Sequence, residues 1–175
     1  MKAVIVYYSK TGFTRRYAQW LAEALGCDCV SYEQRGAISA EDYDIVIFGS
    51  WLRAGKIQKL DWIKKLPEAK GGRRIVFATG AMPAEAKEAI EKVFESNFTH
   101  GQRASIQAFY LPGGLDYDRM DVISRTAMRM LCHMLRGKKK PSDEDVAMLG
   151  MIEKSFDGTN RAAIDPIVTA VNQEK

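Results

Sequence analysis

Short apolar runs alternate with segments of helical periodicity along the first 110 residues, and no other feature constrains the fold as strongly. Strand-like runs occupy residues 2–8, 44–48, 74–79 and 105–110, with a weaker one at 27–32. After the first run, Tyr17, Leu21 and Leu25 recur at helical spacing, and Gly26 marks the end of that helix. This alternation predicts an α/β fold with a parallel sheet covered by helices on both faces.

The pattern changes after residue 110, where the chain becomes mostly helical. We expect a single domain over residues 1–175, with a core at 1–110, a basic helical insertion at 111–141 and C-terminal helices at 142–175. Residues 111–140 include seven Lys or Arg and three Asp, so their net charge of +4 equals that of the whole chain.

Three interpretations of this basic segment are open. Apolar residues recur at helical spacing between Met120 and Leu135, which suits a docked amphipathic helix with a solvated basic face. The same helix would suit peripheral contact of residues 119–140 with an anionic membrane. It would also suit a lid that covers a functional site.

Composition and missing motifs exclude several classes of protein. Three cysteines do not make a disulfide framework, and with two histidines they show no zinc-binding spacing, so we predict no metal site. The chain has neither a P-loop nor a Gly-x-Gly-x-x-Gly motif, and no recognised module for nucleic acid. It also lacks a signal peptide or an apolar run of about 20 residues, so we expect a cytoplasmic protein, with peripheral membrane contact through residues 119–140 as an open alternative.

The loop at residues 9–14, between the first strand and the first helix, carries the strongest functional signal. Its sequence is Ser-Lys-Thr-Gly-Phe-Thr, which places three hydroxyl groups and a glycine at a helix N-terminus. Backbone N–H groups and the positive end of the helix dipole favour a phosphate there, and the glycine allows close approach. A helix start capped by Ser or Thr would look similar, so both interpretations are open at this stage.

This loop resembles the FMN phosphate loop of flavodoxins, (Ser/Thr)-x-Thr-Gly-x-Thr, at every fixed position. Within the family, the resemblance is nearest to flavodoxin domains of the menaquinone-dependent protoporphyrinogen oxidase type. Residues 43–50, residues 52–56 and the basic helical segment also carry it, and it covers residues 1–110 best. It implies a flavodoxin-like three-layer sandwich with a five-stranded parallel sheet in the order 2-1-3-4-5 and a helical C-terminal extension.

By position, the resemblance assigns three loops to FMN. The phosphate would be bound by Ser9, Lys10, Thr11, Gly12, Phe13 and Thr14. The isoalloxazine ring would be bordered by Ser50, Trp51, Leu52, Arg53 and Ala54, and on its other side by Thr79, Gly80, Ala81 and Met82. Trp51 could cover one face of the ring, which leaves the other face to Tyr110 or Tyr117, or open for a substrate. Arg53 would stabilise reduced flavin or a substrate carboxylate, or is a solvated loop residue.

The resemblance implies one of two functions, and we assign no catalytic residue. The first is an FMN-binding redox protein that transfers electrons to a redox partner protein; the absence of His near the predicted loops favours it. The alternative is an FMN-dependent oxidoreductase of the protoporphyrinogen oxidase type, which takes electrons from an organic donor and passes them to a quinone. The long, basic, partly apolar C-terminal region favours this alternative. In both, the flavin supplies the redox chemistry and the protein positions it.

Overall fold

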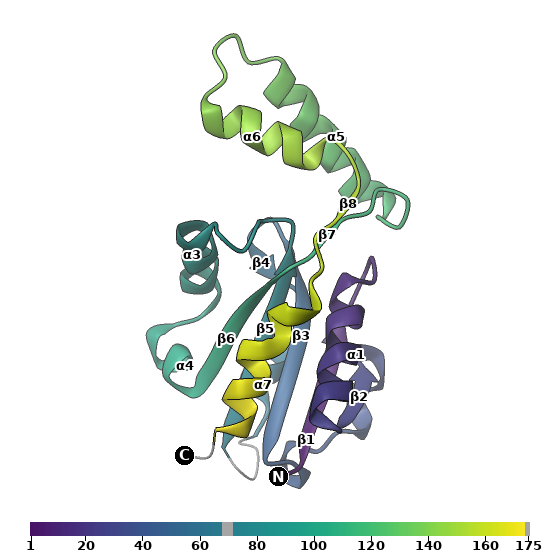
Figure 1. Ribbon diagram of the computed structural model, residues 1–175, viewed down its shortest axis with the longest axis vertical. Coiled ribbons are helices and arrows are strands. Elements are labelled where there is room, and N and C mark those ends of the chain that lie inside the picture. The colour runs from purple at the N-terminus through teal and green to yellow at the C-terminus, as the bar shows by residue number, and fades with distance from the viewer. Residues whose placement is uncertain (68–71, 174–175) are drawn as a thin grey trace.

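The computed structural model describes residues 1–67 and 72–173, which form a sheet of five parallel strands flanked by helices (Figure 1). The strands are β1 (Ala3–Tyr8), β2 (Asp28–Ser31), β3 (Ile45–Arg53), β5 (Arg73–Gly80) and β6 (Ile106–Pro112). Their order across the sheet is β2-β1-β3-β5-β6, which confirms the flavodoxin-like α/β architecture expected from the sequence. A short strand, β4 (Lys56–Ile57), pairs antiparallel with the end of β3.

Two apolar layers enclose the sheet because successive side chains of a strand point to opposite faces. Val4 and Val6 of β1 belong to one layer, which helices α2 (Asp61–Lys65) and α3 (Lys87–Asn97) cover. Ile5 belongs to the other layer, which helices α1 (Phe13–Leu25) and α7 (Asp165–Asn172) cover. The central strands are therefore buried on both faces, which explains why they read as continuous apolar runs.

Shorter helical elements complete the connections within the core. They are α4 (His100–Ser105) and three 3₁₀ turns at Tyr32–Ala37, Ala40–Asp42 and Arg161–Ile164. α4 begins with a capping box in which Thr99 and Gln102 exchange side-chain and backbone hydrogen bonds.

A helical hairpin is inserted between β6 and α7 and projects beyond the carboxyl end of the sheet (Figure 1). Its stem is an antiparallel pair, β7 (Gly114–Leu115) with β8 (Phe156–Asp157). Its arms are α5 (Val122–Arg136) and α6 (Asp143–Ile152), capped by Asp121 and Ser142. The sequence suggested a division between the insertion and the C-terminal helices at residues 141 and 142, and these residues lie in the turn of the hairpin. The first predicted C-terminal helix is therefore α6 of the hairpin, and α7 is the helix that packs on the sheet.

Acidic residues of the second half of the hairpin neutralise the basic charge of the first half. Arg136 pairs with Glu153, and the Lys138 ammonium lies 2.6 Å from a carboxylate oxygen of Asp145. Residues 116–157 contain eight basic and eight acidic side chains, so the hairpin as a whole is neutral. Contact of residues 119–140 with an anionic membrane stays a prediction, and this balance weakens its electrostatic basis.

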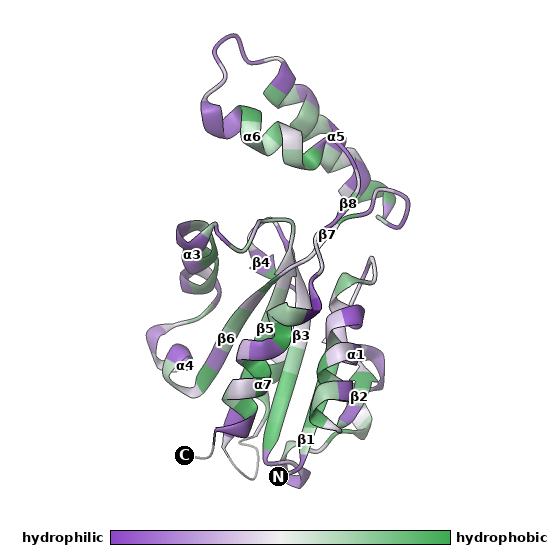
Figure 2. Ribbon diagram, in the orientation of Figure 1, coloured by the Kyte–Doolittle hydropathy of each residue, from purple (hydrophilic) through white to green (hydrophobic). Residues whose placement is uncertain are grey.

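The hairpin also carries most of the large apolar side chains that are exposed among the described residues. Seven of the eight large apolar side chains that are exposed there belong to α5 or α6, and Val122 and Ile123 are 76% and 71% exposed. In Figure 2, hydrophobic and hydrophilic residues intermingle along α5 and α6. Ile123, Met130 and Met134 recur at helical spacing and so share one face of α5. Within residues 1–67 and 72–173, no helix has the length and hydropathy that crossing a membrane requires.

A tight contact in the middle of the sheet gives a stability test. A methyl group at Gly49 of β3 would collide with the buried Phe77 ring of β5. We expect Gly49→Ala to lower the free energy of unfolding by about 3 kcal/mol, as overpacking of a well-packed core does. Urea denaturation followed by circular dichroism measures the change.

Gly150→Ala in α6 is the matched control, because nothing lies within 4 Å of its added methyl group. That change should stabilise the helix by about 0.5–1 kcal/mol. A Gly49→Ala protein as stable as the wild type would contradict the packing described here.

Candidate functional site

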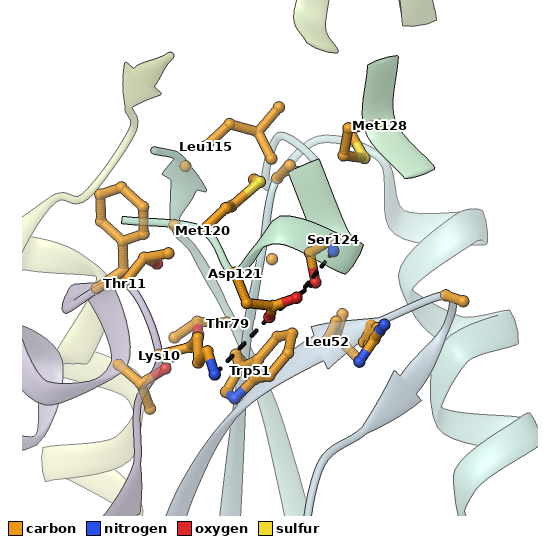
Figure 3. A pocket seen from close by; sticks show the side chains of 18 of the residues that line it. Lys10, Thr11, Trp51, Leu52, Thr79, Leu115, Met120, Asp121, Ser124 and Met128 are labelled. Atoms are coloured by element: carbon orange, nitrogen blue, oxygen red, sulfur yellow. Dashed lines mark hydrogen bonds and ion pairs between the residues drawn. The ribbon is translucent and has the colours of Figure 1, made fainter. Parts of the chain in front are cut away.

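The carboxyl ends of β1, β3 and β5 meet the first half of α5 around a cavity of about 370 Å³ (Figure 3). The loops of parallel strands open at one edge of the sheet, so three of them reach this cavity together. Its walls are formed by Lys10, Thr11, Phe13, Thr14, Trp51, Leu52, Arg53, Ala54, Thr79, Gly80, Ala81, Gly113, Gly114, Leu115, Met120, Asp121, Ser124, Ala127, Met128 and Leu131. Eleven of the fifteen predicted cofactor residues are among them, and Ser9, Gly12, Ser50 and Met82 are not.

The 9–14 loop leads into α1 without a side-chain cap. Gly12 is the N-cap residue, with φ of 104°, and no side chain accepts a hydrogen bond from the first turn. The Ser9 hydroxyl instead accepts a hydrogen bond from the N–H of Gly12 at 3.2 Å, inside the loop. By contrast, α4, α5 and α6 are capped by Thr99, Asp121 and Ser142. The first-turn N–H groups of α1 are therefore available to an anion.

The Thr14 hydroxyl is hydrogen-bonded within the protein. Its side chain is buried, and its hydroxyl oxygen lies 2.7 Å from that of Thr79 at the end of β5. One hydroxyl of this pair donates to the other, so one hydroxyl proton is left for a further acceptor. The pair connects the first and third loops of the site.

Most of the second predicted loop belongs to a strand, because β3 continues to Arg53. Ser50 is fully buried and donates to the carbonyl oxygen of Gln58 at 2.6 Å, so its role is to hold the turn rather than to face the cavity. Asn97 of α3 supports the turn from outside, accepting from the N–H of Ile57 at 2.9 Å and donating to the Gly55 carbonyl at 2.7 Å.

Trp51 offers the cavity an aromatic ring and an N–H donor. Its indole Nε1 is buried and has no hydrogen-bond partner among the described residues. A buried donor of this kind is stabilised when a ligand supplies an acceptor.

The third loop places Thr79, Gly80 and Ala81 at the cavity, while Met82 lies outside it. The Met82 carbonyl accepts a hydrogen bond from the Tyr110 hydroxyl at 2.7 Å. Burial raises the pKa of Tyr110 well above its usual value, so this hydroxyl stays a donor. Tyr117 is also engaged elsewhere, donating to the Ile152 carbonyl. Neither tyrosine lines the cavity, so neither covers the second face that the sequence left open.

Apolar side chains from the hairpin form that remaining wall, and sequence reasoning did not assign them to the site. Leu115 of β7, Met120, and Met128 and Leu131 of α5 lie on this side of the cavity (Figure 3 labels the first three). The helical spacing of Met120, Met128 and Leu131 was visible in the sequence as an apolar stripe. The sequence did not show which surface the stripe contacts, because an amphipathic pattern does not identify the surface against which it packs.

A small group of charges lies at the edge of the cavity. The Lys10 ammonium is 3.7 Å from a carboxylate oxygen of Asp121, as the dashed line in Figure 3 marks. A hydrogen bond from the Ser124 backbone N–H lowers the pKa of Asp121, and the positive charges of Lys10 and Arg53 lower it further. Asp121 is thus an ionised helix cap at neutral pH and not a proton donor.

Taken together, the walls suit a flat, largely apolar ligand that carries an anionic group. The anion would lie at the uncapped start of α1, and the flat part between Trp51 and the apolar side chains of the hairpin. Among the described residues, no group of His, Cys, Asp and Glu side chains is arranged to hold a metal ion.

The hydroxyl pair of Thr14 and Thr79 is testable by a double-mutant cycle. Thr14→Val or Thr79→Val should each lower the free energy of unfolding by about 1–3 kcal/mol, because the remaining buried hydroxyl loses its partner. The double variant should lose less than the sum of the two, since no unpaired hydroxyl remains. Urea denaturation measures all four proteins, with Thr126→Val on exposed α5 as the control; strictly additive losses would rule out the pairing.

The chain is similar in sequence to one protein family and in structure to several solved proteins. A family model described as a flavodoxin domain matches residues 4–142. A flavodoxin from the domain Archaea is 14% identical, covering 87% of this chain and 97% of its own, with a TM-score of 0.42. Oxidised Flavodoxin 1 from Bacillus cereus is 18% identical (87% and 93% covered, TM-score 0.42). A flavodoxin, WrbA-like protein from Agrobacterium tumefaciens is 16% identical (72% and 89% covered, TM-score 0.43). No curated protein matches the chain. Because the family model spans most of the sequence, the chain belongs to the flavodoxin domain family.

Proposed function

We propose that the protein binds FMN in this cavity and uses it to transfer electrons. The observation that carries the proposal is a single cavity lined both by the uncapped start of α1 and by the Trp51 ring. Membership of the flavodoxin domain family supports a flavin cofactor, and FMN is the one typical of the family.

The residues present fit the two chemically different ends of FMN. The phosphate would accept hydrogen bonds from the first-turn N–H groups of α1 and from the Thr11 hydroxyl, next to the positive end of the helix dipole. The ring would lie against Trp51 and Leu52, and the unpartnered Trp51 N–H is a donor for one of its polar atoms. Thr79, Gly80 and Ala81 line the same space.

When bound, FMN would supply the redox chemistry, and the side chains of the site would set its surroundings. Arg53 adds a positive charge at the edge of the cavity, which favours negatively charged forms of a bound ligand. Asp121 is held ionised by its hydrogen bonds and neighbours, so it balances this charge and does not deliver protons.

FMN binding is the first test of this function. Titration of FMN with the wild-type protein, followed by visible absorption and flavin fluorescence, should show saturable binding. The double variant Ser9→Ala/Thr11→Val removes the hydroxyl that holds the Gly12 N–H and the hydroxyl at the cavity, and should bind at least about 100-fold more weakly. Ser96→Ala, at an exposed hydroxyl on α3, is the control. Absence of FMN binding by the wild type would contradict the proposal and leave the loop as an ordinary helix start.

A second candidate is an FMN-dependent oxidoreductase of the protoporphyrinogen oxidase type that passes electrons from an organic donor to a quinone. The apolar wall formed by Leu115, Met120, Met128 and Leu131 supports it, because a cofactor that only exchanges electrons with a protein surface does not need such a wall. Apolar side chains around a flat space are what a quinone-like molecule would contact.

Variants at two neighbouring residues of α5 distinguish the electron-carrier function from the oxidoreductase function. Leu131 lines the cavity, whereas Met130 is 63% exposed and does not line it. If the wall holds a quinone, Leu131→Trp should slow reoxidation of the reduced, FMN-loaded protein by a soluble quinone at least about 10-fold, because the larger ring occupies its place. Met130→Trp should react at the wild-type rate in the same stopped-flow experiment. FMN affinities are measured for both; equal rates in the two variants would favour the electron carrier.

A further inference from the structure

The connection between β7 and α5 reaches back over the 9–14 loop through Arg119. Its guanidinium Nη1 lies 3.4 Å from the Thr11 carbonyl oxygen, across 108 residues of sequence. The same nitrogen lies 3.3 Å from the point where a Cβ atom on Gly12 would stand. A cation from the hairpin therefore rests against the glycine of the loop, and the lack of a side chain on Gly12 makes room for it.

The backbone that carries Arg119 is held in place while its side chain is left free to move. One carboxylate oxygen of Asp116 accepts the N–H groups of Asp118 and Arg119 at 3.1 and 3.0 Å. The N–H of Tyr117 donates to the Ser155 hydroxyl at 3.0 Å, which fixes the same turn to the residue just before β8. The Arg119 side chain is nevertheless 68% exposed, and its ion pair with Asp116 is long, at 3.5 Å.

Two other cations close to the loop are engaged by acidic partners. Lys10 pairs with Asp121, and Arg16 donates to both Asp157 and the hydroxyl of Thr159 at 2.5 and 2.7 Å. Arg119 makes long contacts, at 3.5 Å with the Asp116 carboxylate and at 3.4 Å with the neutral Thr11 carbonyl. A guanidinium binds a phosphate more strongly than a carbonyl, because charge and paired hydrogen bonds then act together.

We propose that Arg119 binds the phosphate of the flavin and so makes the hairpin part of the cofactor site. On binding, its guanidinium moves from the Thr11 carbonyl to the phosphate at the start of α1. The inference rests on the proposed binding of FMN and adds a residue outside the 9–14 loop that distinguishes FMN from riboflavin, the same ring system without phosphate.

Comparison of FMN with riboflavin tests this role directly. Arg119→Ala should weaken FMN binding about 10-fold and leave riboflavin binding within about twofold, since only FMN has the group that Arg119 contacts. Arg119→Lys keeps the charge but not the paired geometry, so its affinity for FMN should lie between those of the wild type and Arg119→Ala. The loss should shrink as salt concentration rises, because the side chain is largely exposed. Fluorescence titration of the full chain with each flavin gives both dissociation constants.

Arg161→Ala is the matched control, because Arg161 is a similarly exposed arginine that pairs with Glu23 near the other end of α1. It should bind both flavins as the wild type does. Equal losses of FMN and riboflavin affinity in Arg119→Ala would overturn the inference, since Arg119 would then act only by positioning the hairpin. Unchanged FMN affinity would overturn it as well. Failure of the wild type to bind either flavin would instead remove the proposed function itself.

Discussion

The parallel pairing of β1 with β3 and of β3 with β5 determines where every part of the site lies. In register, Ile5 stands beside Ile47, and Ile47 beside Ile75, so a row of buried side chains crosses the centre of the sheet. A shift of the strand pairing by one residue would turn these side chains to the other face of the sheet. The packing of both apolar layers disfavours such a shift. The same register places Tyr8 beside Ser50 and Trp51 beside Thr79. The carboxyl ends of the three strands therefore lie at the same edge of the sheet, and residues at these ends line one cavity.

The hairpin depends on the same edge of the sheet for its position. Tyr17 of α1 donates to the Pro112 carbonyl at 2.6 Å and accepts from the Asn160 N–H at 2.9 Å, so it bridges the two chain segments that enter and leave the insertion. Arg16 holds Asp157 of the stem beside the same helix. The insertion is thus attached to the first turns of α1, next to the loop that we propose binds phosphate. This attachment explains how α5 comes to form a wall of the cavity although most of the hairpin extends away from the sheet.

Much of the core site could be predicted because its residues follow strands directly. Lys10, Thr11 and Thr14 come after β1, Trp51 lies at the end of β3 and Thr79 at the end of β5, and a parallel sheet brings such positions together. Details of side-chain direction could not be predicted. Ser50 turns inward to Gln58, and Thr14 pairs with Thr79, because the hydrogen-bond partners of buried hydroxyls come from distant segments.

By itself, the sequence determined the α/β class, the sheet and the position of the 9–14 loop, because these depend on local periodicity and on residues adjacent in the chain. It also predicted an amphipathic helix over residues 120–135, which the structure has at Val122–Arg136. Only the tertiary structure decided that Met128 and Leu131 of this helix close the cavity and that Arg119 rests on Gly12. Each of these is a contact between segments well separated in sequence. Such contacts depend on how the stem of the hairpin is attached to the core. The local sequence pattern of α5 does not contain this information.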